Sequence, residues 1–148
     1  MIMPTRCTTA GKIVDSKTRL TVLESPMIRY QTTGRIQCYT NWMILWLDDE
    51  IGRYYRALCP KHFYVNLPMN KTHISVVRKF ELPDKTNWLS FDGMQLTIEY
   101  EPIVCWDDTY YWLNAFSPEI VEIREALSLS QYLGNYTCQH ITIGNTKN

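Results

Sequence analysis

The sequence has little that would hold it in a membrane. A membrane-spanning helix needs about 20 consecutive, mainly apolar residues, and the longest uninterrupted apolar run here is Trp42 to Leu47. The opening segment MIMPTRCTTAGK lacks the apolar stretch of a secretory signal peptide. We therefore expect a soluble protein that has no membrane partner.

An excess of charge of one sign is also missing. Lysine and arginine together number 15, and aspartate and glutamate also number 15. This balance argues against a basic stripe that follows the backbone of a long nucleic-acid duplex. A local pocket for a small anion needs no net positive charge, so a partner the size of a small nucleotide is compatible with the composition.

The five cysteines are few and scattered, and none forms a CxxC pair: Cys7, Cys38, Cys59, Cys105 and Cys138. This spacing argues against a disulfide framework and against a zinc site, and it indicates a reducing cytoplasm. Carboxylates and histidines do not cluster at the spacing of metal ligands either. The sequence therefore predicts no metal and no cofactor.

Histidine is scarce, with three in 148 residues, yet two of the three stand in matching surroundings. The segments THISVV and QHITIG each contain a histidine, an isoleucine and a hydroxyl residue in succession. Side chains alternate along a strand, so His73 shares a face with Ser75, and His140 shares one with Thr142. His62 lacks this pattern, and we interpret it as a loop residue.

The hydrophobic pattern predicts a mixed sequence of strands and helices. Strands are expected at 34–40, 42–47, 72–80, 94–102, 109–116 and 136–144, helices at 48–59 and 117–131, and a hairpin at 12–24. Each half contains a helix and ends in a motif strand, which indicates a weak internal duplication.

One domain is expected over residues 1–148, with its core at about 42–145 and an N-terminal extension at 1–41. The duplication predicts a two-lobed α+β fold, in which antiparallel sheets line a central cleft and helices lie on the outside. Each lobe would bring one motif strand to that cleft.

Two imidazoles and two hydroxyls in one cleft suit the cleavage of a phosphodiester. One neutral histidine would take a proton from the attacking water or ribose hydroxyl, and one protonated histidine would give a proton to the leaving oxygen. The two hydroxyls would donate hydrogen bonds to the phosphate oxygens. The predicted catalytic residues of this metal-independent phosphodiesterase are His73, Ser75, His140 and Thr142.

The paired H-x-[ST] motifs resemble those of the two-histidine phosphoesterase superfamily, and the resemblance covers roughly residues 42 to 145. The wider pattern is similar to small bacteriophage members of that superfamily. The resemblance implies a substrate such as a cyclic oligonucleotide signal, a 2′,5′-linked or 2′,3′-cyclic nucleotide, or an RNA terminus. It also implies a place in the host cytoplasm during infection, in counter-defence or RNA processing. The first motif departs from the superfamily in having Ser75 where threonine is commoner.

Five further residues are weaker candidates for binding the substrate: Tyr54, Tyr55, Trp88, Arg78 and Asn145. Trp88 would offer a stacking platform for a base. Tyr54 or Tyr55 would present a hydroxyl from the first helix, although core packing is the favoured interpretation. Arg78 would point away from the motif face if the strand stays regular, which favours a surface charge over a phosphate clamp. Asn145 would shape the edge of the cleft.

The sequence pattern around two other residues indicates a structural role and not a role in the site. Trp112 lies in the segment YYWLN, which is typical of a core strand. Arg124 lies between Glu122 and Glu125 on a helix, which is typical of a solvated face. Neither Trp112 nor Arg124 is predicted to take part in the site.

Two functions of other classes fit the same sequence. A nucleotide-binding sponge would capture the ligand without cleaving it, although the four intact motif residues argue against this. A structural protein with a relict fold would bind no nucleotide at all.

Overall fold

The computed structural model describes residues 5–6, 28–68, 71–134 and 136–146. Its elements are β1 (Thr5–Arg6), β2 (Tyr30–Cys38), β3 (Met43–Trp46), α2 (Asp49–Leu58), η1 (Lys61–Phe63), β4 (His73–Val77), η2 (Trp88–Phe91), β5 (Gln95–Trp106), β6 (Tyr110–Phe116), α3 (Pro118–Ala126) and β7 (Gln139–Asn145). The hairpin predicted at 12–24 lies outside the described residues. The other predicted strands and helices are present, with shifted ends.

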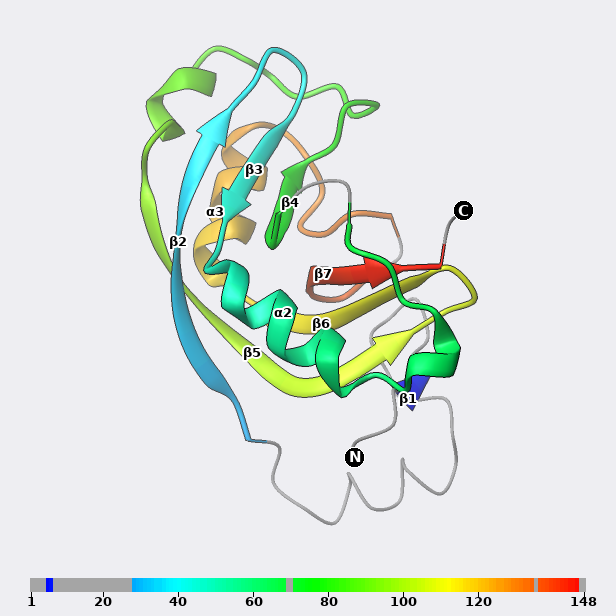
Figure 1. Ribbon diagram of the computed structural model, residues 1–148. Helices are drawn as coiled ribbons and strands as arrows, with labels where there is room; N and C mark the ends of the chain where they lie inside the picture. The colour runs from blue at the N-terminus through cyan, green and yellow to red at the C-terminus, as the bar shows by residue number, and fades with distance from the viewer. Residues whose placement is uncertain (1–4, 7–27, 69–70, 135, 147–148) are drawn as a thin grey trace.

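Six antiparallel strands close into a barrel (Figure 1). The sheet runs in the order β5, β2, β3, β4, β7 and β6, and β6 returns to pair with β5. The short β1 adds a parallel pairing to β5. The predicted two-lobed α+β fold, with sheets lining an open central cleft, is therefore wrong.

The prediction failed because periodicity shows which face of a strand is buried but not which strands bond to one another. The two halves share one sheet, since β4 of the first half pairs with β7 of the second and β2 pairs with β5. A register shift between Tyr100 and Val104 interrupts the pairing of β5 with β6. Irregularities of this kind bend a strand and help a sheet to close.

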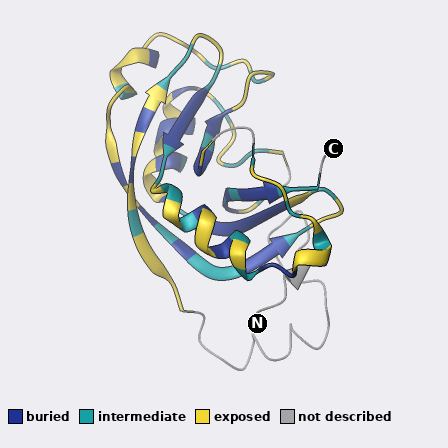
Figure 2. Cartoon of the chain, viewed as in Figure 1, coloured by how far each residue is buried: buried dark blue, intermediate teal, exposed yellow. Residues whose placement is uncertain are grey.

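One apolar cluster fills the barrel. Its strand residues include Ile36, Leu45, Ile74, Val76, Leu96, Ile98, Leu113, Ala115, Ile141 and Ile143. The helices add Tyr55, Ile120 and Ile123, and Leu127 follows α3 directly. Figure 2 shows β3, β4 and β7 largely dark blue, whereas the outward side of α2 is yellow. Each fully buried aliphatic side chain contributes about 1.5–3 kcal/mol to folding before its entropic cost, so this cluster is the main source of stability.

Helix α2 fixes the start of the first motif strand. Asp48 caps the helix, its side chain accepting a hydrogen bond from the Glu50 amide. The Asp49 carboxylate then accepts hydrogen bonds from the amide and the hydroxyl of Thr72, at 3.2 and 3.0 Å. Gly52 is buried against Thr72 and leaves no room for a Cβ atom. The residue before His73 is thereby held against the helix.

Arg124 holds the region where β4 and β7 separate. The described ladder between these strands has two residue pairs, and the free Val76 carbonyl accepts a hydrogen bond of 2.7 Å from Arg124. The same guanidinium forms a 2.7 Å ion pair with Glu81 and is 2% exposed. The prediction that Arg124 belongs to a solvated helix face is therefore wrong.

Candidate functional site

The two motif strands are neighbours in the barrel. His73 on β4 stands opposite Thr142 on β7, and alternation along each strand puts Ser75 on the side of His73 and His140 on the side of Thr142. Directly opposite residues point to the same side of a sheet. All four side chains therefore lie on the outer face of this strand pair, while the isoleucine of each motif lies in the core cluster.

Tryptophans flank the motif residues on both sides. Trp46 of β3 stands opposite His73, and Trp112 of β6 stands opposite Thr142. One row across four strands thus reads Trp46, His73, Thr142, Trp112. The indoles limit the access of water to the polar groups between them.

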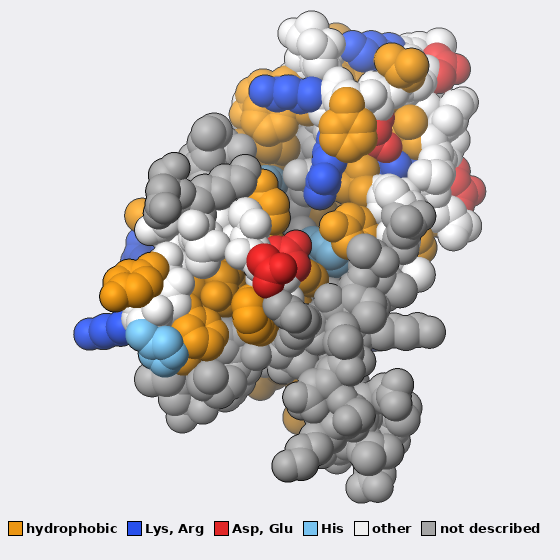
Figure 3. All heavy atoms as spheres, turned by 90° about the vertical axis from the view of Figure 1, so that its right-hand side faces the viewer, with side chains coloured by type: hydrophobic (Ala, Val, Ile, Leu, Met, Phe, Trp, Pro, Cys, Tyr) orange, Lys and Arg blue, Asp and Glu red, His pale blue; other side chains and the backbone are white. Residues whose placement is uncertain are grey.

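A pocket of about 240 Å³ opens beside the motifs. Ser75, His140 and Thr142 line it, and His73 is not among its lining residues. The other lining residues are Arg78, Asp107, Tyr110, Trp112, Ile120, Arg124, Gln131, Tyr132, Leu133, Tyr136, Cys138 and Gln139. In Figure 3, histidine atoms show near the middle of the molecule, with Lys or Arg atoms above them and Asp or Glu atoms beside them.

His140 is enclosed by aromatic rings. Its imidazole stacks on Trp112, with ring centroids 4.9 Å apart, and meets Tyr136 edge-on at 4.4 Å. Its Nε2 is buried without a hydrogen-bond partner. Burial, with a smaller contribution from the Arg78 charge, lowers the pKa of His140 to about 4, although the Asp107 carboxylate opposes the change. His140 is therefore neutral at pH 7.

His73 is more deeply covered, with 9% of its surface exposed. Its ring meets Trp46 edge-on at 5.7 Å, and its Nδ1 lies 2.6 Å from the Lys71 carbonyl oxygen. A carbonyl only accepts hydrogen bonds, so Nδ1 carries the proton. Nε2 is then an acceptor in the neutral ring and becomes a donor only when the ring is protonated. Burial lowers the pKa of His73, the bond to Lys71 raises it and the Arg78 charge lowers it, with a net decrease.

Arg78 reaches the pocket although the alternation of β4 would point it away. The strand ends at Val77, so the alternation does not extend to Arg78, and its side chain lines the pocket beside Ser75. Its charge lowers the pKa of both motif histidines. Among the described residues, no carboxylate lies within 4.0 Å of its guanidinium. Arg78 is thus placed to meet an anionic ligand.

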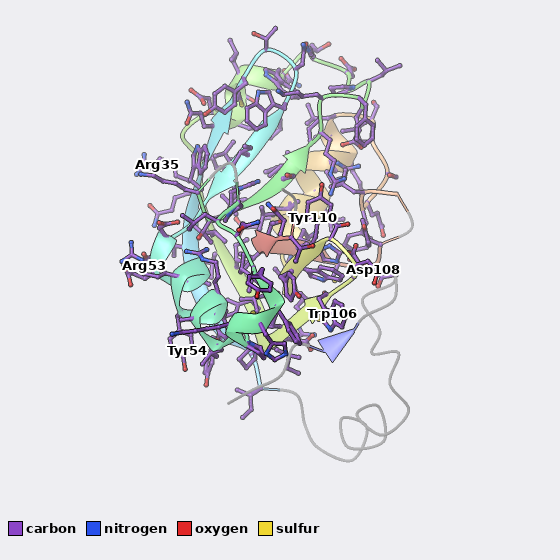
Figure 4. All side chains as sticks on the ribbon, turned by 45° about the vertical axis from the view of Figure 1, so that its right-hand side comes forward. Arg35, Arg53, Tyr54, Trp106, Asp108 and Tyr110 are labelled. Atoms are coloured by element: carbon purple, nitrogen blue, oxygen red, sulfur yellow. The ribbon has the colours of Figure 1, made fainter. Side chains whose placement is uncertain are left out.

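The other weak candidates lie elsewhere. Tyr54 is 60% exposed on α2, and Figure 4 shows it far from Tyr110 of the pocket. Tyr55 and Trp88 are buried in the core cluster, where the indole of Trp88 donates to the Tyr39 carbonyl. Asn145 ends β7 and exchanges backbone hydrogen bonds with Asn66. The structure brings none of these four into the lining of the pocket.

Several lining residues escaped the sequence reasoning. Trp112 is buried as predicted, but it is buried against His140 rather than in the main core cluster. What identifies Trp112 as a site residue is its position opposite Thr142, and this position is known only once the pairing of β6 with β7 is known. Tyr132 and Tyr136 come from the segment directly before the second motif, and Asp107 comes from a turn. The aromatic residues close to QHITIG in the sequence could have indicated that aromatic side chains surround the second motif.

The free cysteines among the described residues are poor nucleophiles. Cys38, Cys59 and Cys138 are free thiols, and burial raises the pKa of Cys38 and Cys138 to about 11. Cys105 is disulfide-bonded, which departs from the expected reduced state. Within the described ranges, no three His, Cys, Asp or Glu side chains gather to hold a metal ion.

No family model, curated protein or solved structure matches this chain. In the described part of the chain, neither helix has the length and apolarity needed to cross a bilayer.

Proposed function

We propose that this protein is a metal-independent phosphodiesterase that cleaves a small nucleotide substrate with its two H-x-[ST] motifs. The supporting observation is the register of β4 and β7, which gathers both motifs on one face beside a pocket. The chemistry would be that of the two-histidine phosphoesterases that the motifs resemble. This register brings the two motifs together without a duplicated fold.

The pocket would bind the phosphate through neutral and charged donors. The hydroxyls of Ser75 and Thr142 and the guanidinium of Arg78 line one space, and hydrogen bonds from an arginine to phosphate are among the strongest in proteins. A volume of about 240 Å³ is below the roughly 300–1,000 Å³ of typical ligand pockets. A single nucleotide with its phosphate is the largest group that we expect it to enclose.

The two imidazoles would divide the proton transfers. Neutral His140 accepts the proton of the attacking water or ribose hydroxyl as the new oxygen–phosphorus bond forms. A bound phosphate anion raises the pKa of a nearby imidazole, so His73 gains a proton in the complex. His73 then gives a proton to the leaving oxygen as the old oxygen–phosphorus bond breaks.

A second candidate function is a nucleotide-binding sponge. The observation that favours it is the lowered pKa of both histidines, because neither imidazole is protonated at neutral pH in the free protein. His73 also lies outside the lining of the pocket. A sponge would use the same donors to hold the ligand without cleaving it.

A cleavage screen separates the two functions. Purified protein would be incubated in EDTA with 2′,3′-cyclic mononucleotides and with 2′,5′-linked and cyclic dinucleotides, and products identified by mass spectrometry. We expect cleavage, and a loss of about 10³-fold in kcat/KM for His140→Ala. His62→Ala, at an exposed histidine outside the pocket, should leave the rate unchanged. A ligand that binds and is recovered intact would instead support the sponge, and full activity of His140→Ala would refute the catalytic assignment.

We place this activity in the cytoplasm of an infected bacterium, acting in RNA end processing or against a nucleotide signal of the host. The support is the similarity of the motif pattern to phage members of the superfamily. Counting the free thiols of protein extracted under alkylating conditions from infected cells would test this placement.

A further inference from the structure

Two buried side-chain polar atoms in the described part of the chain lack a hydrogen-bond partner, and both residues line the same pocket. They are Nε2 of Gln139 and Nε2 of His140. A buried donor without a partner costs about 1–3 kcal/mol, and native structures contain few of them. His140 already has a role in the proposed reaction, whereas Gln139 has none. The unpaired NH₂ group of Gln139 could therefore be satisfied by a hydrogen-bond acceptor on a ligand.

The orientation of the Gln139 side-chain amide is fixed by the hydrogen bond that its oxygen accepts. The Gln139 Oε1 accepts a hydrogen bond of 3.0 Å from the amide of Ser117. A peptide N–H can meet only the oxygen, so the NH₂ group must occupy the opposite side. Ser117 caps α3, and Gln139 is 7% exposed, so the side chain cannot easily turn. Gln139 thus offers a donor to the pocket while its acceptor is engaged.

The surroundings of Gln139 suit a flat, mostly apolar group. Ile120, Tyr132, Leu133 and Cys138 line the same pocket and supply apolar contact. Ligand sites commonly combine such walls with a few placed polar groups that decide which ligand is accepted. A nucleobase meets both requirements, since it is planar and carries hydrogen-bonding groups on its edge.

We propose that Gln139 selects the base of the substrate by donating to the keto oxygen at C4 of uracil or at C6 of guanine. The pocket then prefers uracil to cytosine and guanine to adenine, because cytosine and adenine carry an amine at those positions. This inference rests on the proposed function, because it assumes that a nucleotide occupies the pocket. An exocyclic amine at the same position would place one donor against another and leave both without an acceptor. Sites built on a specific hydrogen bond discriminate strongly against analogues that cannot form it.

The test is equilibrium binding, which does not depend on turnover. Calorimetric titrations at pH 8 would compare uridine and cytidine 3′-monophosphate, then guanosine and adenosine 3′-monophosphate. We expect the keto base of the preferred pair to bind about tenfold more tightly, as one net hydrogen bond implies. Gln139→Glu keeps an acceptor for the Ser117 amide and replaces the donor with an oxygen, so it should abolish or reverse the preference. The matched control is Gln95→Glu, which changes an exposed glutamine outside the lining of the pocket and should leave the ratio unchanged.

The outcomes separate this inference from the catalytic proposal. A keto preference that depends on Gln139 in a protein that cleaves nothing would support the inference and refute the phosphodiesterase. Cleavage without any keto preference would support the phosphodiesterase and refute the inference about Gln139. Equal affinities within each pair, no binding of any of the four nucleotides, or an unchanged ratio in a folded Gln139→Glu variant would overturn the inference.

Discussion

His73 and Thr142 face each other across the β4–β7 ladder although they come from opposite halves of the chain. The positions of the two motifs depend on this register, because a shift of one strand by a single residue would turn the polar side chains of its motif into the core. Arg78 directly follows β4 and acts on the imidazoles of both motifs. The electrostatics of the site can therefore be tested through this one charge.

Replacing Arg78 with methionine should raise the pKa of His140 and of His73, because the Arg78 charge lowers both. The same change removes a charged donor from the phosphate, which should weaken nucleotide binding by about 10- to 100-fold. Titration of the imidazole resonances by NMR measures the first effect, and calorimetry measures the second.

The matched control for this charge is Arg35→Met. Arg35 is an exposed arginine of β2 that Figure 4 shows well away from Tyr110. It should leave both histidine titrations and the affinity unchanged. Identical titration curves for wild type and Arg78→Met would show that the guanidinium lies too far from the imidazoles to serve the site.

His140 should make the protein lose stability as the pH falls from about 6.5 to about 4. Its folded pKa of about 4 lies below the ordinary value of 6.5, so the unfolded chain binds more protons in that window. Stability is then fully present above pH 6.5 and decreases as the solution becomes more acidic. Urea unfolding at several pH values should show a shallower acid-side decrease for His140→Gln than for wild type. His62→Gln should follow the wild-type curve, and an equal decrease in all three proteins would contradict the buried state of His140.

The sequence predicted the motif strands well because their signal is local. Alternation alone places His140 and Thr142 on one face of a strand, and the described structure has them on one face of β7. Capping and proline signals likewise predicted α3, with Ser117 as its cap. The helix ends at Ala126 rather than Gln131, since Ser128 has a positive φ of 60°.

The architecture was not predictable in the same way, because strand pairing is non-local. The sequence cannot show that β6 returns to β5, and this single pairing turns the sheet into a barrel. It cannot show that Trp112 stands beside Thr142, which is why an aromatic wall of the site was interpreted as core. The inward turn of Arg124 depends on the separation of β4 from β7, which is also a property of the assembled sheet.

Gly52→Ala should destabilise the protein even though alanine favours helices. A Cβ atom at this position would overlap the Thr72 hydroxyl, and forced overpacking costs about 1–3 kcal/mol. Helix propensity alone would instead stabilise the variant by up to about 1 kcal/mol, so the sign of the change is informative. Chemical denaturation measures it, and the exposed Ala57→Gly on the same helix calibrates the propensity effect. A more stable Gly52→Ala would show that α2 does not press on the residue before His73.

Neutralising Glu81 should cost about 3–5 kcal/mol, because the buried guanidinium of Arg124 then lacks its carboxylate partner. Removing Arg124 should cost a similar amount, because the Val76 and Ser130 carbonyls lose their donor. Glu81→Gln and Arg124→Met should each show this loss in urea unfolding, and the double variant should lose less than the two single losses combined. The exposed pair of Arg53 and Glu50 is the matched control, since removing such a pair costs at most about 1 kcal/mol.

The guanidinium of Arg124 also donates to the Ser130 carbonyl, at the start of the segment that carries Tyr132 and Tyr136 into the pocket. Nucleotide binding should therefore weaken in Arg124→Met more than in Glu81→Gln, even where the two variants are equally stable, because the glutamine leaves the guanidinium and its carbonyl contacts in place. Equal affinities in the two variants would mean that Arg124 supports the fold without shaping the pocket.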